Sequence, residues 1–89
     1  MRVTIRRARG GSGRMAILLD FEKVRDDGRE VEYVFGYPEL NRRLVILKDS
    51  QQGRALDGNE DRDYAAVLVK LLRIRRSRGT WPVKGSYAA

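Results

Sequence analysis

The chain has 89 residues, of which 42% are hydrophobic and 35% are charged, and its formal net charge is +7 at pH 7. It contains no cysteine and no histidine. This composition excludes a disulfide framework, a thiolate zinc site, a cysteine nucleophile and the most common general acid–base of enzymes. The length predicts one domain spanning residues 1–89, near the lower limit for a core that is stable without cross-links.

The positive charge is concentrated at the two ends of the chain. Residues 1–14 hold five arginines and no acidic residue, and residues 70–89 hold six basic residues and no acidic residue. Between them, residues 15–69 hold eight basic and twelve acidic residues, a net charge of −4. Such an asymmetry is typical of a protein that binds an anionic partner.

Alternating apolar and polar residues predict strands in the first half of the chain. A short strand covers Arg2–Arg6, and a second one covers Met15–Val24. Between them, the glycine-rich residues 8–14 form a flexible loop at the tip of a hairpin. Alternation resumes in residues 31–37, which predict a third strand with aromatic side chains on one face.

The loop between the second and third strands decides their register. A two-residue loop, Asp27-Gly28, would place Phe21 opposite Val34 and mix the two faces of the sheet. A three-residue loop that ends at a left-handed Gly28 places Phe21 opposite Tyr33 and keeps the large apolar side chains on one face. We therefore expect the three-residue loop.

The second half of the chain predicts one more strand and a helix. Residues 44–47 are consecutively apolar, which is typical of a strand buried on both faces. A polar loop at residues 49–60 leads to a helix over residues 62–78, with Asp61 as its N-cap and Gly79 as the residue that ends it. The apolar stripe of this helix comprises Tyr64, Val67, Leu68, Leu71 and Ile74.

These elements predict an α+β fold, in which a four-stranded antiparallel sheet is followed by one C-terminal helix (ββββα) and an extended tail at residues 79–89. One helix covers one face of the sheet, which leaves apolar residues such as Leu18 and Val34 on the other face. Either the tail or another chain covers that second face. We expect a second copy, so that the protein is a homodimer.

The predicted order of four strands and a helix resembles that of the PUR repeat and of Whirly-type single-strand nucleic-acid binders. This resemblance covers most of the chain and rests on the order of the elements alone. Those families assemble as dimers or pseudo-dimers, so the resemblance implies a dimer with a nucleic-acid partner.

The acidic residues do not form a pattern typical of catalysis. Most of them fall in predicted turns, loops or the helix cap, where solvation and capping explain them. Asp20 and Glu22 share the outward side of one strand, where we expect neighbouring basic residues to neutralise them. We therefore expect a protein that is not an enzyme and that has no catalytic residues, no cofactor and no metal.

The arginine-rich segments are the strongest functional signal. Four arginines occur between Arg73 and Arg78, more than a helix end needs to balance its dipole. Arginine binds phosphate through paired N–H donors, so we predict a domain that binds DNA or RNA mainly through phosphates, with little base readout. The candidate contact residues are Arg6, Arg7, Arg9, Arg14, Lys70, Arg73, Arg75, Arg76, Arg78, Trp81 and Lys84.

An alternative function is that of a protein-interaction or assembly subunit, which homo-oligomerises or binds an acidic protein partner. In that case the arginines serve solubility and electrostatic steering. No apolar stretch approaches the about 20 residues of a transmembrane segment, and the basic N-terminus lacks the apolar stretch of a signal peptide. We expect a protein without a transmembrane segment, located in the cytoplasm.

Overall fold

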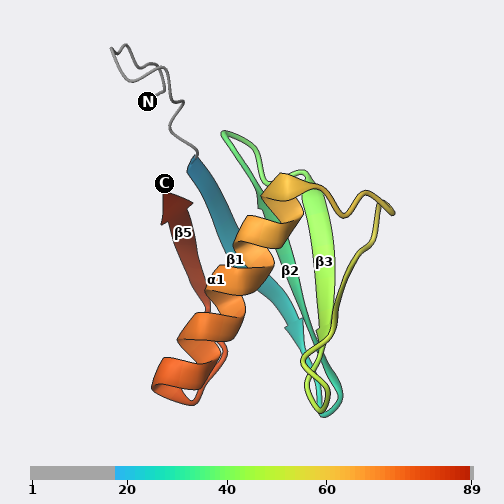
Figure 1. Ribbon diagram of the computed structural model, residues 1–89, viewed down its shortest axis with the longest axis vertical. Helices are drawn as coiled ribbons and strands as arrows, with labels where there is room; N and C mark the ends of the chain where they lie inside the picture. Colours follow the sequence, from blue (N-terminus) through green and yellow to red (C-terminus); the bar gives the residue numbers. More distant parts are fainter. Residues whose placement is uncertain (1–17, 89) are drawn as a thin grey trace.

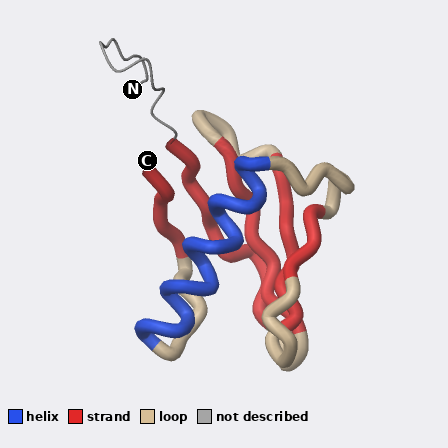
Figure 2. Tube along the Cα trace, viewed as in Figure 1, coloured by secondary structure: helices blue, strands red, loops and turns tan. Residues whose placement is uncertain are grey.

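The computed structural model describes residues 18–88, which form five strands and one helix (Figure 1). All neighbouring strands are antiparallel, in the order β4-β3-β2-β1-β5. The helix crosses one face of this sheet (Figure 2), which confirms the predicted α+β class with an antiparallel sheet. The elements are β1 (Leu18–Asp26), β2 (Glu30–Gly36), β3 (Arg42–Leu47), β4 (Gly53–Ala55), α1 (Arg62–Arg78) and β5 (Lys84–Ala88).

The prediction of four strands that end in a helix is wrong, because the described sheet has five strands and α1 is followed by β5. The predicted polar loop 49–60 contains β4, and the predicted tail 79–89 contains β5. Both strands are short and contain no large aliphatic residue, so apolar alternation does not reveal them. The order that resembled the PUR repeat is therefore not the order of residues 18–88. The predicted strand at residues 2–6 and the loop at residues 8–14 lie outside the described residues.

The register of β1 against β2 differs from the predicted one by two residues. Phe21 lies opposite Phe35 and not opposite Tyr33. Because side chains alternate between the two faces of a sheet, a shift by an even number of residues leaves each of them on the predicted face. The prediction that aromatic residues share a face is confirmed for Phe21, Tyr33 and Phe35, whereas Tyr37 follows the end of β2, and the predicted cross-strand pairs are wrong.

The turn between β1 and β2 explains this shift. The pairing of β1 skips Val24, which forms a β-bulge. The Asp27 carboxylate accepts hydrogen bonds from the backbone N–H groups of Arg29 and Glu30, both at 2.8 Å. In this turn Gly28 does not have a positive φ, so the predicted three-residue loop with a left-handed glycine is replaced by a turn that a carboxylate stabilises.

The core lies between α1 and the sheet face that carries the aromatic residues. The rings of Phe21 and Tyr33 meet edge to face, with their centroids 5.9 Å apart. Val67 and Leu71 of α1 are fully buried against this face. Because these residues lie four positions apart, they extend from the same side of the helix and bury the predicted apolar stripe.

Both predicted caps of α1 are present. The Asp61 carboxylate accepts a hydrogen bond from the backbone N–H of Tyr64 at 3.0 Å. At the other end, Gly79 adopts the left-handed conformation with φ of 80°, and its N–H donates to the carbonyl of Arg75 at 2.8 Å. Local sequence therefore determines where this helix begins and ends.

Tyr33 anchors the segment that joins α1 to β5. Its hydroxyl donates a hydrogen bond to the carbonyl oxygen of Pro82 at 2.5 Å. Burial raises the pKa of Tyr33, which keeps the phenol protonated and able to donate. Trp81 and Tyr87, on either side of Pro82 in the sequence, pack against the core. These contacts position β5 beside β1.

The second face of the sheet is covered largely by charged side chains. Val45 is only 3% exposed and lies between its cross-strand neighbours Glu32 and Arg54. The Glu32 carboxylate accepts hydrogen bonds from Arg25 at 3.0 Å and from Arg43 at 2.9 Å. The tail does not cover this face, because it forms β5 at the sheet edge. The homodimer stays a prediction.

A substitution at Gly85 tests the packing of β5 against β1. A Cβ atom at this position would lie 2.8 Å from Cζ of Phe21, whose side chain is 1% exposed. We expect Gly85→Ala to lower the free energy of unfolding by about 1–3 kcal/mol, because the ring has no room to move. Urea denaturation measures the loss. Gly28→Ala is the matched control, since a Cβ there meets nothing within 4 Å, and an equal loss in both variants would contradict the assignment.

Candidate functional site

Opposite charges are separated within the described part of the chain. Residues 18–61, which contain β1 to β4, hold seven basic and eleven acidic residues, a net charge of −4. Residues 62–88, which contain α1 and β5, hold seven basic residues and one acidic residue, a net charge of +6. The C-terminal end of α1 lies near the start of β5 (Figure 1), so most of the positive charge gathers on one side of the domain.

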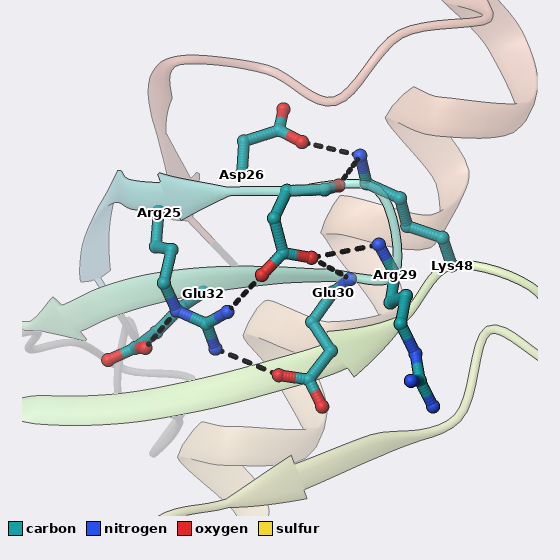
Figure 3. A network of polar contacts seen from close by, with 7 residues as sticks. Arg25, Asp26, Arg29, Glu30, Glu32 and Lys48 are labelled. Carbon is teal, nitrogen blue, oxygen red and sulfur yellow. Dashed lines mark hydrogen bonds and ion pairs between the residues drawn. The ribbon is translucent and has the colours of Figure 1, made fainter.

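Arg25 and Lys48, beside the β1–β2 turn, form ion pairs with nearby carboxylates (Figure 3). The Arg25 guanidinium lies between three of them, at 2.6, 2.9 and 3.0 Å, and these contacts raise its pKa. Asp26 contacts Lys23 at 2.8 Å and Lys48 at 2.5 Å, and the hydrogen bonds from Lys23 and then Lys48 lower the pKa of that carboxyl. The carboxylates that contact Arg25 belong to Asp27, Glu30 and Glu32.

Arg42 connects the start of β3 to the beginning of the helix. Its guanidinium contacts the carboxylates of Asp57 at 2.9 Å and Asp61 at 3.0 Å, and it donates to the backbone carbonyl of Asn59 at 2.7 Å. It also lies over the ring of Phe35, 4.8 Å from the centroid. The positive charge of Arg42 is therefore used to hold the loop before α1 in place.

The basic residues of α1 and β5 differ from most of those in residues 18–61, five of which form ion pairs. Within residues 18–88, no ion pair involves any of them. The one acidic residue of this region, Asp63, lies in the first turn of α1, about 18 Å along the helix axis from Arg75. The residues concerned are Arg62, Lys70, Arg73, Arg75, Arg76, Arg78 and Lys84.

The helix brings together five of the predicted contact residues, which we call the helix cluster: Lys70, Arg73, Arg75, Arg76 and Arg78. Most of them are exposed. The guanidinium carbon of Arg75 lies 5.8 Å from the ring centroid of Trp81, and this tryptophan is half-buried. Lys84 is exposed at the start of β5. The other predicted contact residues lie outside the described residues: Arg6, Arg7, Arg9 and Arg14.

A shallow groove of about 350 Å³ runs between one flank of α1 and β5. Arg62 belongs to it but was not among the predicted contact residues. Arg62 lies eight residues before Lys70 and eleven before Arg73, which places all three on the same flank of a helix. A helical projection of the sequence could therefore have identified Arg62 as a contact residue. The lining residues are Arg62, Ala65, Ala66, Val69, Lys70, Arg73 and Tyr87.

The described residues form a basic surface and a groove, but they contain no set of metal ligands. Within residues 18–88, no group of three or more acidic, histidine or cysteine side chains is arranged to hold a metal ion. The helix in this part of the chain is neither long nor apolar enough to cross a membrane. Comparison of the chain with family models, curated proteins and solved structures found no match. The arrangement is suited to binding an anion.

The ion pairs predict how stability depends on pH. The pKa of Asp61 is lowered by the backbone N–H of Tyr64 and by Arg42, and that of Glu32 is lowered chiefly by Arg43. A carboxyl group whose pKa is lowered by folding contributes stability above its unfolded pKa and loses it as pH falls through its folded pKa. We expect the melting temperature to be retained down to about pH 5 and to fall below it. An unchanged melting temperature at pH 3 would contradict this expectation.

A comparison of two neighbouring arginines tests the role of Arg42. The side chain of Arg42 is 19% exposed and that of Arg43 is 56% exposed. We expect Arg42→Ala to lower the free energy of unfolding by about 1–3 kcal/mol, because two carboxylates and a carbonyl each lose one charged donor. Arg43→Ala, the control, is expected to cost about 0.5 kcal/mol. Urea denaturation of both variants decides, and equal losses would contradict the role of Arg42.

Proposed function

We propose that the protein binds nucleic acid through phosphates, with the helix cluster as its contact surface. The observation that carries this proposal is the difference between two sets of basic residues. Five of the seven basic residues in residues 18–61 contact carboxylates, and Arg29 and Arg54 are the exceptions, whereas all seven basic residues of α1 and β5 have no ion-pair partner within residues 18–88. Unpaired arginines on one surface attract an external anion.

The helix cluster is too far from acidic residues of its own helix to be neutralised by them. Asp63 lies beyond the Debye length of about 8 Å at physiological ionic strength, measured along the axis from Arg75. The last turn carries Arg75, Arg76 and Arg78, where the helix dipole favours positive charge. These side chains remain available to displace the counterions of a phosphate backbone.

The aromatic residues favour phosphate contacts over base stacking. Phe21, Tyr33 and Phe35 are buried beneath α1, so they do not form an open platform for bases. Trp81 and Tyr87 are half-buried and pack against the core. This leaves a binding surface dominated by arginine and lysine, which supports binding with little discrimination between sequences.

Fluorescence anisotropy with labelled 20-nucleotide DNA and RNA strands and a 20-base-pair DNA duplex tests the proposal. With about four phosphate contacts, affinity is expected to fall about a hundredfold between 50 and 200 mM salt. The double variant R73A/R76A should bind less tightly and reduce the salt slope by about two. Both residues are exposed, so the fold should be unaffected.

The matched control is the double variant R29A/R54A. It removes the same charge from two exposed arginines on the turn and on β4. We expect its affinity to stay much closer to that of the unmodified protein. Absence of binding to all three nucleic acids at 50 mM salt would overturn the proposal, and so would an equal loss in the two double variants.

A further inference from the structure

β5 forms one edge of the described sheet and pairs only with β1 among residues 18–88. The opposite edge is β4, which has three residues. A short edge strand offers few backbone groups to another chain, whereas an edge of five residues offers more. β5 carries a single charged residue, Lys84, and is the more accessible template for an added strand.

The phase of the β1–β5 ladder determines which backbone groups of β5 face outward. The N–H of Lys23 donates to the carbonyl of Val83 at 2.7 Å. In an antiparallel ladder the residues that bond to the neighbouring strand alternate, so Gly85 and Tyr87 face β1. The residues whose N–H and C=O groups point to the open edge are therefore Lys84, Ser86 and Ala88.

The groove between α1 and β5 lies beside this edge. Tyr87 reaches it from β5, and Val69 reaches it from α1 with 50% of its surface exposed. Arg62 and Arg73 lie on the same flank, about 16 Å apart along the helix axis. A strand added to β5 would direct every second side chain toward this flank, where apolar contacts and two separated positive charges are available.

We propose that an extended acidic segment of a partner protein adds to the sheet as a strand along β5, with its acidic side chains directed at the α1 flank. The open edge alternates N–H donors and C=O acceptors, and a peptide backbone satisfies both. A phosphate backbone supplies acceptors only, so it would leave the outward carbonyls without donors. This surface shares Lys70 and Arg73 with the helix cluster but does not include its last turn, and the proposal does not rest on nucleic-acid binding.

Charge also argues against a second copy of this chain at the same place. Pairing β5 with β5 of another copy would bring together two regions that each carry a net charge of +6. Like charges on neighbouring strands and helices repel one another. An acidic segment instead neutralises Arg62, Lys70 and Arg73, none of which forms an ion pair within the described residues.

Selection from a displayed library of random octapeptides provides the probe. We expect the enriched peptides to alternate acidic and apolar residues, and we would use the most enriched one as a labelled synthetic peptide. S86P should weaken its binding at least about tenfold, because proline removes the outward N–H without removing a bond to β1. S86A is the matched control, since it also loses the hydroxyl that donates to Asp20 but keeps its N–H.

A charge-reversal pair tests the acidic character independently of proline. R62E should weaken binding of the same peptide at least about tenfold, whereas R54E, on the opposite edge strand, should not. Failure to enrich any peptide, enrichment of basic peptides, or equal binding by the unmodified protein and S86P would each overturn the proposal. A competition experiment with a single-stranded oligonucleotide identifies the other possible occupant. If the oligonucleotide displaces all of the peptide from S86A and from R54E, and S86P binds the oligonucleotide as tightly as they do, the groove belongs to nucleic acid.

Hydrogen exchange identifies the occupant of the edge. In the free protein at low concentration, the amides of Gly85 and Tyr87 should be protected and that of Ser86 should exchange rapidly, then slow when the peptide binds. Protection of Ser86 without peptide would overturn the proposal. If that protection is independent of protein concentration, the chain covers its own edge, and if it grows with concentration, a second copy does.

Discussion

The structure depends on the packing of α1 against the aromatic face of the sheet. Phe21, Tyr33 and Phe35 are almost fully buried, and the helix contributes Val67 and Leu71 to the same core. In a chain of this size, one helix has to supply most of the apolar cover, because no second helix is present within residues 18–88. The same helix links β4 at one edge of the sheet to β5 at the other, so its position also determines where the C-terminal strand lies.

This arrangement explains why charge is distributed so unevenly. Within residues 18–88 no helix covers the second face of the sheet, and ion pairs such as Arg25–Glu32–Arg43 cover part of it. The carboxylates form ion pairs on that face and at the start of α1, where Arg42 binds Asp61. The outer side of α1 has to be polar for solubility and carries almost only positive charge. A surface of this kind is suited to an anionic partner, and the open edge of β5 adds backbone groups to it.

Several parts of the fold could be predicted because they depend on neighbours in the sequence. Alternation at residues 31–37 indicates one buried face, and the caps Asp61 and Gly79 mark the ends of the helix. The register of β1 could not be predicted, because a bulge at Val24 and the hydrogen bonds of Asp27 shift it by two residues. β5 was missed because it lacks an apolar pattern and is held by contacts with distant residues, such as that of Tyr33 with Pro82.

The sequence by itself determined the class of the fold, the helix with its caps, the aromatic core face and the five basic residues of the helix cluster, since each follows from local periodicity and composition. Only the tertiary structure decided which basic residues are neutralised. That depends on cross-strand and loop contacts such as Arg42 with Asp57, which are fifteen residues apart. It also decided that Arg62 joins Tyr87 in one groove and that β5 occupies an edge, because strand order arises from burial across the whole domain and not from any local signal.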